Sequence, residues 1–82
     1  MMTLSDTIVF MISDDYKERF RAEYDQLNIR MTKLEKFIEM FKDDELSFEP
    51  TCSIDLLEKQ LDVMKTYKVI LEERAKLENV DV

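Results

Sequence analysis

The chain has 82 residues, which is enough for one small domain. It contains no Gly, His or Trp and a single Cys, so glycine-rich phosphate loops, zinc quartets, Ser-His-Asp triads and internal disulfides are excluded. The net charge of −7 disfavours direct binding to nucleic acid and to membrane surfaces, but it permits docking on a basic protein surface. These features predict a cytoplasmic protein that is not an enzyme and that carries no metal or cofactor.

The first residues differ from the rest, and residues 1–12 are predicted to form an N-terminal arm. Residues 8–12 are a run of five apolar residues, which is too short to span a bilayer. No basic segment precedes the run and no small-residue cleavage site follows it, so a signal peptide is not expected. β-branched residues lower its helix propensity. Three alternatives stay open: a short helix capped by Ser5, an extended arm, or a segment upstream of a start at Met11.

A long amphipathic helix is predicted over residues 13–43, at the start of a helical domain that spans residues 13–82. Ser13 or Asp14 can cap its first turn, and Lys42 suits its last turn. Apolar residues recur along it at alternating steps of four and three, as at the a and d positions of a heptad, and such a seam requires a partner. The seam residues are Phe20, Tyr24, Leu27, Met31, Leu34, Ile38 and Phe41.

Residues 43–52 are predicted to connect this helix to a second one, because the segment begins with acidic residues and contains Pro50. The second helix is expected to run from its N-cap Ser53 to about Glu78, and residues 79–82 are expected to fray. A connection of this length makes the helices antiparallel neighbours. The resulting apolar pairs are Met31 with Met64, Tyr24 with Leu71, Leu34 with Leu61, Ile38 with Leu57, and Phe20 with Ala75.

The predicted fold is therefore an all-α antiparallel two-helix hairpin with a short N-terminal arm. The second helix carries a second apolar stripe, which makes it too apolar to pack on the first helix alone. The arm, a second copy of the chain or a target covers this stripe. Small size favours a second copy, and hence a homodimer that forms a four-helix bundle. The predicted interface between copies consists of Phe37, Leu56, Val63, Tyr67, Ile70 and Leu77.

Two arginines and a tyrosine form a candidate ligand site on the same flank. Tyr67 and Arg74 are one heptad apart and lie near Arg30 in the predicted register. Aromatic rings beside guanidinium groups are what a nucleotide site uses for stacking and for bidentate hydrogen bonds. The competing interpretation, which we favour from the sequence, is structural pairing, in which Glu23 reaches Arg74 and Arg30 lies against the Tyr67 ring.

Several short segments resemble a known family. They are EYDQL (23–27), KLEKFI (33–38), IDLL (54–57), QL (60–61) and ILEER (70–74), with Arg30, Met64 and Tyr67 between them. They are similar to a family of small phage proteins that is named after an open reading frame of a crAss-like phage, over about residues 13–78. The resemblance implies a phage or prophage origin and a two-helix core, and it carries over no activity and no functional residues.

The leading functional hypothesis is a non-enzymatic phage-type protein that inhibits a host defence protein, such as a CRISPR-associated nuclease, in the cytoplasm of the host bacterium. It uses an acidic helical face, which consists of Glu39, Glu58 and Asp62. The alternative is an oligomeric sponge that sequesters a nucleotide immune signal at Arg30, Tyr67 and Arg74. A structural or scaffolding helical protein is the second alternative. The sponge requires arginines that are free of carboxylates, whereas the inhibitor requires an uninterrupted acidic face.

Overall fold

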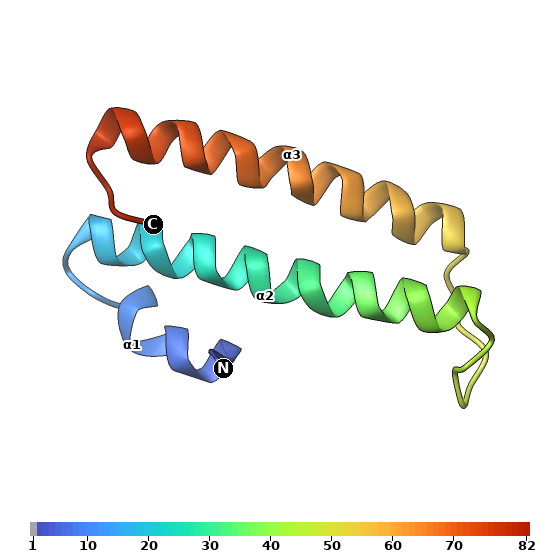
Figure 1. Ribbon diagram of the computed structural model, residues 1–82. Helices are drawn as coiled ribbons and strands as arrows, with labels where there is room; N and C mark the ends of the chain where they lie inside the picture. The colour runs from blue at the N-terminus through green and yellow to red at the C-terminus, as the bar shows by residue number, and fades with distance from the viewer. Residues whose placement is uncertain (1) are drawn as a thin grey trace.

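The computed structural model describes residues 2–82, and Figure 1 shows that helices dominate it. A short 3-10 helix, η1 (Leu4–Thr7), precedes the helices α1 (Ile8–Met11), α2 (Tyr16–Lys42) and α3 (Ile54–Glu78). Residues 2–82 contain no β-strand, so the all-α prediction is confirmed. Met1, the first residue of the predicted arm, lies outside the described residues.

The N-cap of α2 lies one residue after Asp14 and two after Ser13, the two predicted caps. Asp15, rather than Ser13 or Asp14, is the N-cap, and its carboxylate accepts a hydrogen bond of 2.9 Å from the backbone N–H of Lys17. The extended backbone at Asp15 brings this carboxylate over the first free amides of the helix. The Ser13 hydroxyl instead accepts a hydrogen bond of 3.1 Å from the Asp15 backbone N–H, so it supports the capping residue.

α3 starts where the sequence predicts. The Ser53 hydroxyl accepts a hydrogen bond of 3.2 Å from the Leu56 backbone N–H, which confirms Ser53 as the N-cap. At the other end Asn79 adopts the left-handed conformation with φ of 56°, which Asn tolerates better than most residues. The Val80 backbone N–H then donates to the Ala75 carbonyl at 2.9 Å, so the helix closes in a turn of the Schellman type.

The prediction that residues 79–82 fray is wrong. The left-handed turn at Asn79 reverses the chain, and the Val80 side chain is buried against the core. Two cations of α2 hold the returning backbone: the Lys17 ammonium donates to the Asn79 carbonyl at 3.0 Å, and the Arg21 guanidinium donates to the Asp81 carbonyl at 2.9 Å. The tail thus ties the end of α3 to the start of α2.

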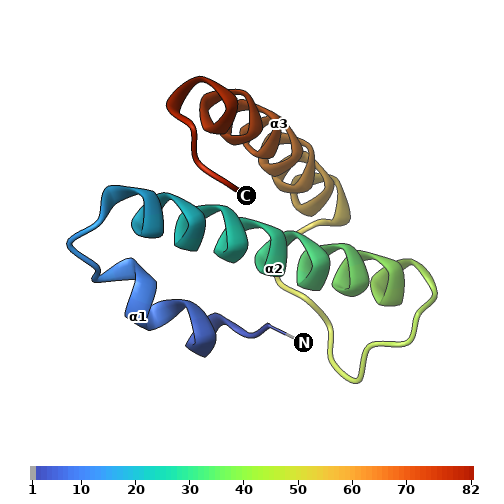
Figure 2. The ribbon, with the colours of Figure 1, turned by 60° about the vertical axis from the view of Figure 1, so that its left-hand side comes forward.

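α2 is the middle layer of the molecule. In Figures 1 and 2 α3 lies along one side of α2 with the chain direction reversed, and α1 lies on the other side, beside the N-terminal half of α2. η1 and α1 both contact α2, and within residues 2–82 neither of them contacts α3. The chain is elongated, with extents of 43 × 24 × 19 Å.

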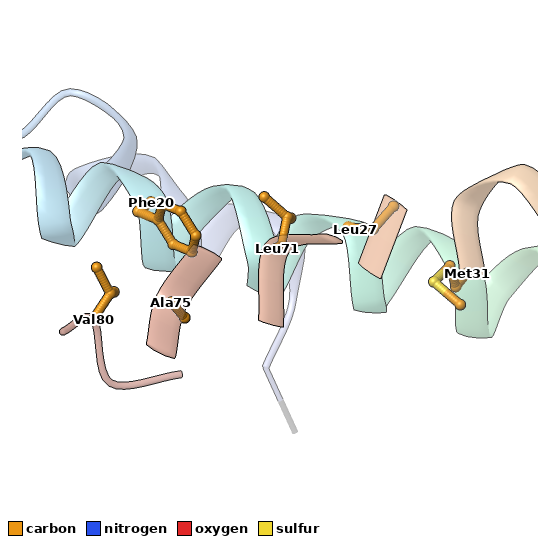
Figure 3. Close-up of a cluster of buried hydrophobic side chains, with 6 residues drawn as sticks. All are labelled: Phe20, Leu27, Met31, Leu71, Ala75 and Val80. Carbon is orange, nitrogen blue, oxygen red and sulfur yellow. The ribbon is translucent and has the colours of Figure 1, made fainter. Parts of the chain in front are cut away.

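The core lies between α2 and α3, toward the end where the tail returns (Figure 3). Predicted seam residues of both helices meet there, and the half-buried side chains of Tyr24, Leu61 and Met64 pack against them. Heptad spacing places six polar residues on one flank of the two helices, which we refer to as the polar flank: Arg21, Asn28, Glu35, Glu58, Lys65 and Glu72. There Lys42 pairs with Glu58 at 3.0 Å and links the two helices near the connection. The buried members of the core are Phe20, Leu27, Met31, Leu71, Ala75 and Val80.

The predicted pairing of Met31 with Met64, both of which belong to the core region, leads to a testable prediction. Met31→Ala is expected to lower the free energy of unfolding by about 2–4 kcal/mol, and Met64→Ala by less, because Met31 is buried and Met64 is half-buried. The double variant is expected to lose less than the sum, since residues that touch are not additive. Urea denaturation of the four proteins measures this, and full additivity would contradict the expected contact.

Candidate functional site

One face of α3 is apolar and exposed to solvent. Leu56, Val63, Ile70 and Leu77 follow one another at steps of seven residues, which return to nearly the same face of a helix, and Tyr67 lies between Val63 and Ile70, about one turn from each. Val63 is 63% exposed and Leu77 is 84% exposed, which shows that neither contributes to the contact with α2. We refer to Leu56, Val63, Tyr67, Ile70 and Leu77 as the α3 stripe.

The N-terminal arm does not cover the α3 stripe. η1 and α1 lie on the far side of α2, and within the described residues they make no contact with α3. The sequence left three candidates to cover the α3 stripe, and the fold rules out the first of them, the N-terminal arm. A second copy of the chain and a target protein are the covers that stay open.

Phe37, the sixth predicted interface residue, lies on α2 and is half-buried. The ring of Phe48, from the connection, lies beside it with ring centroids 6.1 Å apart. Phe48 is exposed, so the connection adds an aromatic side chain to this part of the surface. Sequence reasoning missed Phe48 as a surface residue, because helical periodicity gives no information about how a connection folds back.

Arg74 is held by a residue of its own helix. Its guanidinium donates to the Glu78 carboxylate at 2.9 Å and lies 4.9 Å from the centre of the Phe20 ring. The hydrogen bond to Glu78 is the main reason that the pKa of Arg74 is raised, and the charges of Glu78 and Glu23 contribute less. The predicted pairing with Glu23 is therefore wrong, because Glu78, one helical turn away, is already in place.

Arg30, the other arginine of the candidate ligand site, has no partner among the described residues. Its side chain is exposed, and among residues 2–82 it forms neither an ion pair nor a side-chain hydrogen bond. The predicted stacking of Arg30 on the Tyr67 ring is absent from the described part of the chain, where the cation–π contact joins Arg74 to Phe20. Arg30 and Tyr67 are both free to contact a ligand.

The candidate acidic face is interrupted by cations. Glu58 pairs with Lys42 at 3.0 Å, and Lys65 is exposed on the same predicted flank. Glu39 and Asp62 are exposed, and neither forms an ion pair with another of the described residues. Two of the three predicted carboxylates are thus available, but the face is not uniformly acidic.

The polar flank holds a contact that sequence reasoning missed. The Tyr24 hydroxyl donates to the Glu72 carboxylate at 2.7 Å, and this hydrogen bond is the largest reason that the pKa of Tyr24 is raised. The bond links α2 to α3 beside the core, which gives it a structural role. The described residues contain no cluster of three or more potential metal ligands. None of the helices in residues 2–82 has the length and apolar character needed to cross a membrane.

Comparison with known proteins places the chain in a family. The sequence model of the Sequestin family matches residues 14–77, which include all of α2, the connection and all but the last residue of α3. No curated protein and no solved structure matches the chain. The matched segment covers more than half of the chain, leaves out η1 and α1, and bears on neither a phage origin nor a host. The chain therefore belongs to the Sequestin family.

Proposed function

We propose that the chain is a non-enzymatic binding protein that sequesters a nucleotide signal in the cytoplasm of a host bacterium, as a self-associated bundle. The observation that carries the proposal is that the Arg30, Tyr67 and Arg74 side chains, which heptad spacing assigns to one flank, are all exposed, and that Arg30 has no partner among residues 2–82. The name of the Sequestin family, which refers to sequestering, supports the general activity. The nucleotide is our inference from the chemistry of the three side chains.

The chemistry of these residues suits a nucleotide. A guanidinium group binds phosphate oxygens through two parallel hydrogen bonds, and a tyrosine ring stacks on a base. Arg30 needs no rearrangement, because it has no partner among residues 2–82. Arg74 has to exchange Glu78 for the ligand, and exposed ion pairs one helical turn apart stabilise a helix by only about 0.3–0.5 kcal/mol.

A single chain has only one wall of a ligand site, and self-association supplies the second wall. Small-molecule sites enclose most of the ligand surface, whereas Arg30, Tyr67 and Arg74 of one chain are exposed. A second copy packed on the α3 stripe forms the opposite wall and buries the apolar side chains. A standard interface buries about 800 Å² per partner. The long faces of this chain, 43 Å in length and 19–24 Å across, are large enough for that.

The proposed interface predicts the behaviour of two valine variants on α3. Val63→Glu is expected to lower the number of copies per particle, because a buried carboxylate without a partner costs several kcal/mol, about 3 or more. Val69→Glu is the matched control, since Val69 is exposed on α3 but is not part of the α3 stripe. Light scattering at tens of micromolar measures both masses. A monomeric wild-type chain, or equal masses for the two variants, would contradict the interface.

The second candidate function is inhibition of a host defence protein through the acidic face. The net charge of −7 and the exposed Glu39 and Asp62 side chains favour it. Such docking depends on electrostatic attraction, so it weakens with salt and loses mainly its association rate. Charge reversal by Glu39→Lys and Asp62→Lys separates the candidates: it weakens an inhibitor, and it leaves nucleotide binding at Arg30 unchanged.

A further inference from the structure

The N-terminal arm presents an uncovered apolar surface of its own. All five side chains of residues 8–12 are exposed, and Val9 and Ile12 are 71% and 77% exposed. Exposed contiguous apolar surface on a small soluble chain is typical of an interaction site. We refer to Ile8, Val9, Phe10, Met11 and Ile12 as the arm patch.

A polar contact fixes the arm on α2. The Gln26 amide of α2 donates to the Thr7 hydroxyl at 2.9 Å and also contacts the sulfur of Met11. Thr7 is 1% exposed, and its hydroxyl donates to the Leu4 carbonyl at 2.7 Å. Ala22 of α2 is buried as well. The contacts of Gln26 with Thr7 and Met11 therefore hold the arm on α2, while Ile8, Val9 and Ile12 each stay more than half exposed.

The arm patch and the α3 stripe are separate surfaces. Figures 1 and 2 show α1 on one side of α2 and α3 on the other side. Within residues 2–82, α1 and α3 do not touch. A dimer that closes through the α3 stripe therefore leaves two arm patches uncovered. The family model matches residues 14–77 and so does not include the arm.

The charges around the arm patch favour a second copy over a membrane. Residues 2–15 contain Asp6, Asp14 and Asp15 and no Lys or Arg, and amphipathic helices that bind anionic lipids depend on basic residues. The patch itself is uncharged. Two copies related by a two-fold axis place patch on patch, with the carboxylates at the rim, where water and salt screen their repulsion.

The arm patch is too small to form a strong contact alone, so we expect arm-to-arm contacts to form two at a time. Five side chains provide less than the roughly 800 Å² per partner of a standard interface, so a single arm-to-arm contact is weak. A dimer held by the α3 stripe carries two arms. The second arm contact then forms within one assembly at high effective concentration, which strengthens the pair of contacts well beyond either one alone.

We infer that the arm patch is a second contact between copies, which joins α3-stripe dimers into a closed assembly of four or more chains, even in number. Two different two-fold contacts on each chain generate dihedral assemblies, of which the tetramer is the smallest. The inference rests on the dimer proposed above and not on the identity of the ligand.

Native mass spectrometry of the full chain tests this inference. The wild-type chain is expected to form particles of at least four copies. Ile12→Glu is expected to give dimers held by the α3 stripe. Val63→Glu is expected to give mostly monomers with a minor fraction of dimers held by the weak arm contact, and the double variant is expected to give monomers alone. Ser5→Glu is the matched control, because Ser5 is an exposed polar residue of the same arm, and it is expected to keep the wild-type mass.

The outcomes separate the two interfaces. A wild-type dimer, or an Ile12→Glu particle with the wild-type number of copies, would overturn the arm contact. A Val63→Glu particle that keeps the wild-type number of copies, while Ile12→Glu lowers it, would overturn the α3-stripe dimer and leave the arm contact standing. Circular dichroism confirms that each variant is helical, which Ile12→Glu is expected to be, since Ile12 is largely exposed.

Discussion

Leu71→Ala is expected to lower the free energy of unfolding by about 3–5 kcal/mol, the largest loss from a single side-chain truncation in this chain. Leu71 is 1% exposed and lies in the core between α2 and α3, with Phe20 and Leu27 of α2 among the cluster (Figure 3). A domain of this size has a total stability of only about 5 kcal/mol, so the variant is expected to be largely unfolded at room temperature.

Val69→Ala is the matched control for this prediction. Val69 lies two residues away on the same helix and is about half exposed, so its truncation is expected to change stability by less than about 0.5 kcal/mol. Urea denaturation followed by circular dichroism measures both variants. A loss below about 1 kcal/mol for Leu71→Ala would mean that the contact between α2 and α3 contributes little to the fold.

Arg30→Ala and Tyr67→Ala are each expected to weaken nucleotide binding by about tenfold to a hundredfold while the protein stays folded. A hydrogen bond to a charged group contributes about 1.5–3 kcal/mol, and base stacking on an aromatic ring contributes about 1–3 kcal/mol. Both side chains are exposed in the single chain, so neither truncation opens a cavity in the core.

Two further arginine variants separate a local contact from general charge. Arg21→Ala removes the same charge on the polar flank, where Arg21 holds the tail, and it is expected to keep nucleotide affinity. Arg74→Ala is expected to weaken binding with little loss of stability, since Arg74 is exposed and its ion pair with Glu78 lies within one turn of the same helix. Calorimetry and thermal melts measure affinity and stability in parallel. Equal loss of affinity in Arg21→Ala and Arg30→Ala would point to nonspecific attraction.

The long-range order of the fold follows from a pattern that the sequence carries. Apolar residues from Phe20 to Phe41 recur with the period of a helix, so the length of α2 and the side of it that faces α3 are readable without a structure. Ser53 is similarly predictable, because a capping hydroxyl before an apolar periodic segment has one common role. These features depend on local chemistry repeated over many residues.

The features that were missed depend on single contacts between distant residues. The bond between Gln26 and Thr7 joins side chains 19 positions apart, and no periodic pattern marks it. The buried Val80 depends on one left-handed residue, Asn79, after an ordinary helix end. Sequence alone could not place the arm on α2 or the tail on the core.

For the candidate site, the sequence proposes a set of residues, and the structure shows that they are exposed and which contacts they make. Heptad spacing places Arg30, Tyr67 and Arg74 on one flank, beside the stripe that the second helix leaves unpaired. The choice between Glu23 and Glu78 as the partner of Arg74 depends on side-chain conformations. Arg74 pairs with Glu78, because a partner one turn away on the same helix needs no contact between helices.

Titration calorimetry of the full chain with a panel of cyclic and ADP-ribose-type nucleotides measures the proposed nucleotide binding itself. We expect at least one of them to bind with a Kd of about 1 μM or tighter, which corresponds to about −8 kcal/mol. Binding is expected to weaken by about tenfold to a hundredfold in Arg30→Ala and to be kept when Glu39 and Asp62 are replaced by Lys. Absence of binding to every nucleotide of the panel, or full affinity in Arg30→Ala, would contradict the proposal.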